Sequence, residues 1–126
     1  QLQRRLMDDL KLSYRVVDIC TGDMGFAAAS LVDLETWFPA RRAFVETHST
    51  SNTTDFQTRR LGTKFRAKDG TRALVHAVNG TAVAIQRTLA ALLETHQEAD
   101  GSVRIPDVLR PYLGGRERLT NPRHGS

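Results

Sequence analysis

The chain has 126 residues, of which 40% are hydrophobic, and its 18 lysines and arginines against 14 aspartates and glutamates give a formal net charge of +4. This composition predicts one globular domain with one core. Apolar runs end well before the ~20 residues of a membrane-spanning helix, and no secretory pattern opens the chain. We therefore expect a cytoplasmic protein with no membrane partner. The basic residues are spread from Arg4 to Arg123, so charge alone gives little support to nucleic-acid binding.

The first half of the chain predicts a helix followed by antiparallel strands. Residues 1–12 carry leucines at helical spacing, and residues 14–20 are rich in β-branched side chains and precede a glycine-containing turn. Residues 27–38 alternate apolar and polar side chains up to Pro39, and residues 43–49 continue the β pattern. We expect these strands to form a meander.

The second half predicts a hairpin and a long helix. Residues 55–61 suit a short helix capped by Thr54 or Asp55, and residues 63–66 and 72–78 flank an Asp-Gly hairpin turn. Apolar side chains from Ile85 to His96 follow the helical period and predict a helix packed on the sheet.

Beyond the long helix, Asp100-Gly101 marks a turn and Pro106 can open a short helix. Gly114-Gly115 is expected to end the ordered structure. We expect residues 1–118 to form the domain and residues 119–126 to be a disordered polar tail.

The dipeptide Asn79-Gly80 supports two interpretations. It is a preferred hairpin turn, and it could equally connect a strand to the following helix. The helical period extends back to Ala82 without a breaker, which favours the strand-to-helix connection.

Three other residues are expected to be structural. The single cysteine, Cys20, excludes an internal disulfide and argues against a zinc site, so it is predicted to be a small buried side chain. His76 and His96 are predicted to be core or boundary histidines, and no triad order is present.

Two stretches combine dense polar groups with β-type runs: ETHSTSNTTDFQTRR at residues 46–60 and VHAVNGTAVAIQRTL at residues 75–89. With YRVVDICTGDMG at residues 14–25, WFP at residues 37–39 and IPDVLRPYLGG at residues 105–115, they resemble in collinear order the C-terminal part of the catalytic domain of seryl-tRNA synthetases, which are class II aminoacyl-tRNA synthetases. The chain departs from the family pattern at these positions: His48, Thr50, Thr53, Ala82 and Gln86.

The resemblance implies an α+β fold, with a mostly antiparallel sheet flanked by helices that forms part of a class II catalytic core. The first two class II motifs and the tRNA-binding coiled-coil arm precede the region resembled. The chain therefore looks like a fragment that is inactive alone.

The implied function is ATP-dependent attachment of L-serine to tRNA(Ser), and to tRNA(Sec), through a seryl-adenylate in a homodimeric enzyme with ATP and Mg²⁺. Arg87 matches the catalytic motif arginine, and Asn79 and Thr81 match the serine pocket. The ATP site is matched by Arg87 and by Glu46, Thr47, His48 and Ser49, of which Glu46 and Ser49 also match the Mg²⁺ ligands. Two alternatives are a paralogue that activates serine for another acceptor and a non-catalytic binding module.

Overall fold

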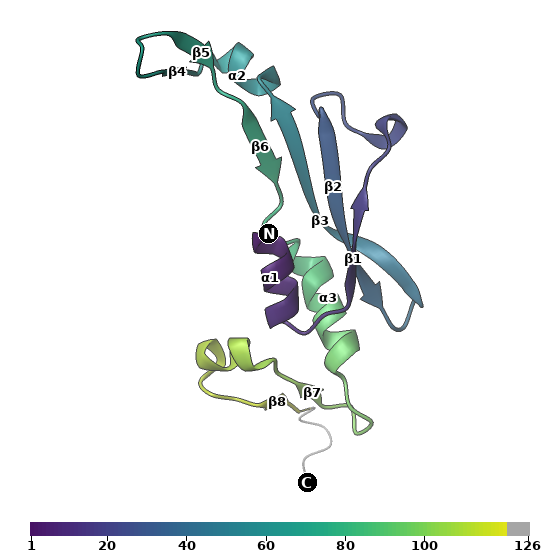
Figure 1. Cartoon of the computed structure of the whole chain (residues 1–126). Helices are drawn as coiled ribbons and strands as arrows, with labels where there is room; N and C mark the ends of the chain where they lie inside the picture. Colours follow the sequence, from purple (N-terminus) through teal and green to yellow (C-terminus); the bar gives the residue numbers. More distant parts are fainter. Residues whose placement is uncertain (121–126) are drawn as a thin grey trace.

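The computed structural model describes residues 1–120. Its centre is a four-stranded antiparallel sheet in the order β1-β2-β3-β6, preceded by the helix α1 (Figure 1). These elements are α1 (Leu2–Asp9), β1 (Tyr14–Asp18), β2 (Ser30–Phe38), β3 (Ala43–Thr54) and β6 (Ala77–Gly80).

The remaining elements lie outside this sheet. β4 and β5 form a separate hairpin next to α2, and β7 and β8 form a second short pair after the long helix α3. Their bounds are η1 (Thr21–Asp23), α2 (Phe56–Leu61), β4 (Lys64–Arg66), β5 (Arg72–Leu74), α3 (Ile85–His96), β7 (Val103–Arg104), η2 (Asp107–Leu113) and β8 (Arg118–Leu119).

The core lies between one face of the sheet and the two helices α1 and α3. It contains apolar side chains from α1 and the segment after it, from alternate positions of β2, and from α3, as expected when a strand buries every second residue. The buried members are Met7, Leu10, Leu12, Leu34, Phe38 and Ala91. The helix α3 thus packs on the sheet, as its periodicity predicted.

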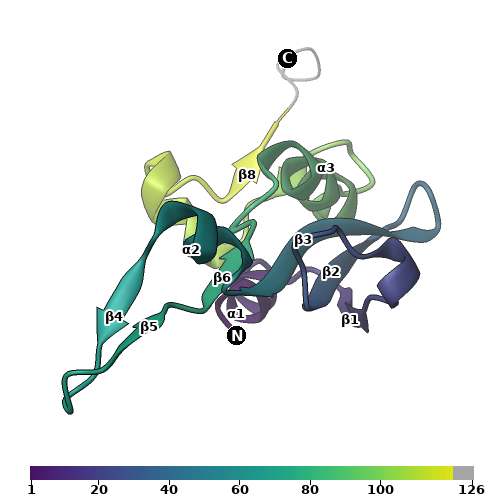
Figure 2. The same ribbon diagram turned by 90° about the horizontal axis from the view of Figure 1, so that it is seen from above.

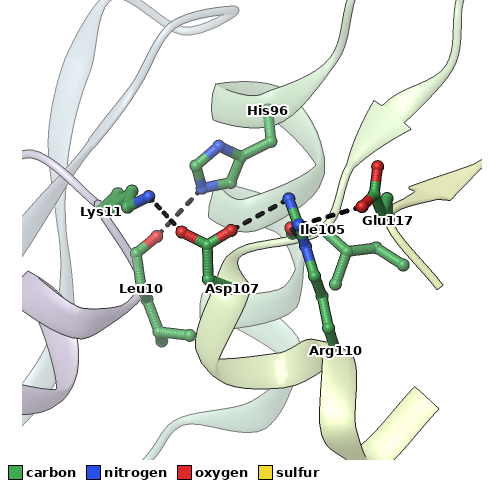
Figure 3. Close-up of polar contacts among 7 residues, drawn as sticks. All are labelled: Leu10, Lys11, His96, Ile105, Asp107, Arg110 and Glu117. Carbon is green, nitrogen blue, oxygen red and sulfur yellow. Dashed lines mark hydrogen bonds and ion pairs between the residues drawn. The ribbon is translucent and has the colours of Figure 1, made fainter. Parts of the chain in front are cut away.

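Polar contacts join the segment that follows α1 to η2 and to α3 (Figure 3). Lys11 Nζ lies 2.8 Å from Asp107 Oδ2, and Arg110 Nη2 lies 2.9 Å from Asp107 Oδ1. His96 Nε2 lies 3.0 Å from the backbone carbonyl oxygen of Leu10, and the histidine is buried. His96 is therefore a satisfied core histidine, as predicted.

Several predicted boundaries were wrong. β3 continues past Ser49 to Thr54, because these polar residues pair with β2 on one side and with β6 on the other. The strand predicted at residues 72–78 is split into β5 and β6, and α3 begins at Ile85 rather than Ala82. Asp55 occupies the N-cap position of α2, although its side chain makes no capping hydrogen bond.

Other differences concern single residues and the C-terminal segment. Cys20 is exposed rather than buried, and His76 is exposed rather than in the core or at its boundary. Ordered structure continues past Gly114-Gly115, because β8 pairs with β7 and takes in Leu119, the first residue of the expected tail. Residues 121–126 of that tail lie outside the described residues. Within residues 1–120, no helix is long and apolar enough to span a membrane.

Candidate functional site

A β-bulge in β3 sets the direction of the predicted ATP-site residues. Glu46 lies opposite Glu35 of β2, whereas His48 lies opposite Leu34, so Thr47 is one extra residue on β3. Such a bulge shifts the alternation of side chains along the strand.

The bulge brings Glu46 and Ser49 to the same face of the sheet. In a regular strand, residues three apart point to opposite faces. Here Glu46 pairs with Glu35 and Ser49 pairs with Asp33, and these β2 residues are two apart and share a face. A carboxylate and a hydroxyl of β3 therefore point away from the core together.

Thr47 and His48 lie on the core side of β3, with 1% and 0% of their surfaces exposed. Thr47 Oγ1 lies 2.7 Å from Thr36 Oγ1 and 2.9 Å from His48 Nδ1. These buried hydrogen bonds stabilise the bulge on the core side of the sheet. In this conformation neither side chain has surface open to a nucleotide. Their assignment to the ATP site stays a prediction, and the structure gives them a supporting position.

The imidazole of His48 is an unusual buried group. Its Nε2 has no hydrogen-bond partner among the described residues. Burial lowers the pKa of His48 below its ordinary value of 6.5, because desolvation disfavours the imidazolium, while the backbone of Ala82 acts in the opposite sense. Burial therefore favours the neutral form of the ring, which lies near the Ala82 backbone between β6 and α3.

The predicted serine-site residues lie on the same face as Glu46 and Ser49. Asn79 pairs with Ser51, which is two residues beyond Ser49 on β3. The backbone N–H of Thr81 donates to the carbonyl oxygen of Ser49 at 2.9 Å, which places Thr81 next to β3. Asn79 and Thr81 are both exposed.

Gln3 of α1 makes hydrogen bonds to Thr81 and to β3. The sequence did not predict this role. Gln3 Nε2 donates to the backbone carbonyl oxygen of Thr81 at 2.7 Å, and Thr50 Oγ1 donates to Gln3 Oε1 at 3.0 Å. Gly80 allows this close approach, because a Cβ added there would lie 2.9 Å from Thr50 Oγ1 and 3.2 Å from the Ser49 carbonyl oxygen. The loop before α3 is thus fixed to both β3 and α1.

Arg87, in the first turn of α3, reaches back to β3. Its Nη1 donates to the backbone carbonyl oxygen of Glu46 at 2.7 Å and lies 3.4 Å from Glu46 Oε2. The fold thus joins the predicted catalytic arginine to one predicted ATP-site residue, although 41 positions separate them in sequence.

The same face carries two acidic residues that the sequence did not single out. Asp33 lies opposite Ser49, and its Oδ1 is buried without a partner among the described residues. Glu35 accepts a hydrogen bond from Arg15 Nε at 2.5 Å. Their position could have been found from the alternation of Asp33 and Glu35 with Leu34 and Thr36, but their pairing with β3 depends on the bulge.

The donor set is compatible with Mg²⁺. Among residues 1–120, no group of three His, Cys, Asp or Glu side chains is placed to hold a metal ion. Mg²⁺ bound together with a nucleotide needs only one or two protein ligands, because phosphates and waters supply the rest. The carboxylate of Glu46 and the hydroxyl of Ser49 are oxygen donors on one face and fit that requirement.

Comparison with known proteins shows the family of the chain. Residues 1–96 match the family model of the tRNA synthetase class II core domain (G, H, P, S and T). The chain belongs to the class II tRNA synthetase core family. The predicted α+β class is confirmed, since the sheet is antiparallel and helices flank it.

Curated relatives of this class II core chain include the serine–tRNA ligase of Clavibacter michiganensis, 56% identical over 118 residues, which make up 94% of this chain and 28% of the relative. The serine–tRNA ligase of Burkholderia cenocepacia is 51% identical over 121 residues, or 96% of this chain and 28% of the relative. The chain thus spans about 28% of the length of these relatives.

Two solved structures have the same fold as this class II core chain. The seryl-tRNA synthetase of Pyrococcus horikoshii complexed with ATP superposes with a TM-score of 0.88 at 46% identity, over 94% of this chain and 27% of that one. The cytoplasmic serine–tRNA ligase of Naegleria fowleri in complex with AMP gives 0.86 at 38% identity, over 95% and 29%.

Proposed function

We propose that this chain forms part of the active site of a serine–tRNA ligase, which uses ATP to attach L-serine to tRNA(Ser), and also to tRNA(Sec), through a seryl-adenylate. The observation that carries the proposal is the common face of the sheet that presents Glu46, Ser49, Asn79 and Thr81, with Arg87 directly beside Glu46. The names of the relatives and of the solved structures support the same reaction.

The reaction requires charge neutralisation rather than a protein nucleophile. The serine carboxylate attacks the α-phosphate of ATP, the bond to the β-phosphate breaks, and pyrophosphate leaves. Arg87 is half-exposed and can turn from Glu46 toward a nucleotide, where a guanidinium can stack on adenine and bind phosphate. Mg²⁺, held by Glu46 and Ser49, would supply further neutralisation of the phosphates.

The serine pocket in this proposal is formed by Asn79 and Thr81. Recognition of a small hydroxylated side chain needs paired polar groups, because alanine is rejected only when it leaves a polar partner unsatisfied. Thr81 is held by its backbone on both sides, through Ser49 and through Gln3. That support fixes the backbone from which the Thr81 hydroxyl extends, and discrimination requires such positioning.

The proposal also covers the oligomeric state of the enzyme and its cellular compartment. The resemblance to seryl-tRNA synthetases implies a homodimer, so we propose a homodimeric, cytoplasmic enzyme. The exposed apolar side chains of α3, which include Ile85 at 70% and Leu89 at 53% exposure, offer surface that further protein could cover.

A chimeric ligase tests the function. This chain replaces the matching 118 residues of the Clavibacter michiganensis relative, and serine-dependent ATP–pyrophosphate exchange is measured. We expect exchange by the chimera, and none by the 126-residue chain alone. A folded chimera that binds ATP yet shows no serine-dependent exchange would contradict the proposal. Charging of tRNA(Ser) and of tRNA(Sec) transcripts by the chimera then tests the two acceptors separately.

A further inference from the structure

The β4–β5 hairpin projects from the body of the protein beyond α2, at the end of the sheet away from β7 and β8 (Figures 1 and 2). Its register places Lys64 opposite Leu74 and Arg66 opposite Arg72. Because paired residues and residues two apart share a face, Lys64, Arg66 and Arg72 lie on one face of this two-stranded ribbon. All three side chains are exposed.

These cations have no acidic partner. Within residues 1–120, none of the ion pairs includes Lys64, Arg66 or Arg72. The acidic residue at the tip, Asp69, instead accepts hydrogen bonds from the backbone N–H and the hydroxyl of Thr71. Like charges directly opposite each other on neighbouring strands are destabilising. The arrangement of Arg66 and Arg72 therefore favours an anion between them.

The hairpin also has a hollow next to these cations. A surface cavity of about 380 Å³ is lined by Gly62, Lys64, Phe65, Arg66 and Arg72. The half-exposed side chain of Phe65, which pairs with Ala73, lies on the opposite face of the ribbon from the three cations. Guanidinium groups bind phosphate through paired hydrogen bonds.

We propose that the β4–β5 hairpin binds the sugar–phosphate backbone of an RNA, with Lys64, Arg66 and Arg72 contacting phosphates. This inference rests on the proposed function for the kind of nucleic acid, since an RNA is the acceptor there. Only residues 75–76 separate β5 from β6, the strand that carries Asn79. The β4–β5 hairpin therefore binds the RNA close to β6, the strand that contributes Asn79 to the proposed serine pocket.

The first test measures binding of the chain itself to a fluorescein-labelled RNA stem-loop. Binding is followed by fluorescence anisotropy between about 50 and 200 mM NaCl. The variant Arg66→Glu/Arg72→Glu is compared with Arg4→Glu/Arg5→Glu, which makes the same change in net charge on exposed residues of α1. Circular dichroism and thermal melting check that both variants remain folded. The conservative variant Arg66→Lys/Arg72→Lys keeps the charge of the hairpin.

We expect Arg66→Glu/Arg72→Glu to weaken RNA binding about tenfold at the lower salt concentration, and to reduce the slope of log K against log salt by about 0.9 for each phosphate that the variant no longer neutralises. Arg4→Glu/Arg5→Glu and the lysine variant should bind within a few-fold of the wild type. Equal losses in both glutamate variants would overturn the proposal, because net charge alone would then explain binding.

Two further outcomes separate this inference from others. Hairpin-dependent binding to phosphatidylserine vesicles without RNA binding would overturn it in favour of a lipid surface. The RNA assay needs neither ATP nor serine, so it reports on the hairpin whether or not the chimeric ligase activates serine. Loss of pyrophosphate exchange with intact RNA binding would therefore refute the proposed function alone.

Discussion

Arg87 and Glu46 are joined twice, because Arg87 Nη1 donates to the Glu46 backbone carbonyl oxygen at 2.7 Å and also lies 3.4 Å from Glu46 Oε2. Both side chains are about half-exposed, at 53% and 47%, so the ion pair contributes little to stability. Its significance lies in position, since it brings the first turn of α3 onto the strand that carries Ser49.

Replacing Arg87 by alanine in the chimeric ligase should slow adenylate formation far more than it weakens serine binding. Charge develops on the leaving pyrophosphate, and loss of one such stabilising group typically costs about 3–4 kcal/mol, or roughly a hundred- to thousand-fold in rate. Pyrophosphate exchange at varied serine concentration measures both effects. A raised serine KM with unchanged kcat would show that Arg87 has a different role.

Replacing Thr81 by alanine should act on substrate selection instead. The change removes a hydroxyl from the proposed pocket but keeps the backbone contacts to Ser49 and Gln3. We expect a higher serine KM and poorer discrimination against alanine, with a smaller effect on the KM for ATP. Exchange assays with serine, alanine and ATP varied in turn decide this, and an equal loss for all three substrates would count against the assignment.

Replacing Gly80 by alanine should destabilise the pairing of β6 with β3. The new Cβ would lie 3.2 Å from the backbone oxygen of Ser49, which cannot move without shifting β3. Overpacking of this kind costs about 1–3 kcal/mol. The matched control is Gly22→Ala, where no atom lies within 4 Å of the added Cβ. Urea unfolding of the two variants should separate them, and equal midpoints would mean that β3 relaxes easily.

His48 should make the stability of the chain depend on pH. Its pKa in the folded state lies below the ordinary 6.5, so the unfolded chain binds the proton more tightly. The stabilisation from neutral, buried His48 is present above pH 6.5 and is lost as the pH falls through the folded-state pKa. Urea midpoints of the wild type should fall on acidification below that pH, and His48→Gln should flatten this part of the curve. An unchanged slope in the variant would assign it to another group.

The helix from Ile85 to His96 could be predicted from the sequence because its signal is local, with apolar residues at helical spacing and no breaker. The bulge at Thr47 could not, because an extra residue is defined only relative to the partner strand β2. The continuation of β3 to Thr54 was missed for a similar reason. Its threonines, serine and asparagine lack an apolar pattern, and backbone pairing with β2 and β6 holds this segment in the sheet.

The candidate site likewise has features that the sequence predicted and features that depend on tertiary packing. Family motifs in the sequence singled out Glu46, Ser49 and Arg87, but only the bulge explains how two side chains three positions apart can act on one side of a sheet. Gln3 and Asp33 were not predicted, because their relation to the site arises from the packing of α1 and from strand register.

The contacts of Figure 3 join parts of the chain that are distant in sequence, since 96 positions separate Lys11 from Asp107 and 86 separate Leu10 from His96. Closing so large a loop is entropically costly, so we expect this junction to form late in folding and to open first in unfolding. Hydrogen exchange of the β7 and β8 amides would then report an opening of lower free energy than that of the central sheet. Exchange of both regions at one common rate would show a single cooperative unit. This junction would therefore govern the resistance of residues 1–120 to proteolysis, although the candidate site lies on the opposite face of the sheet.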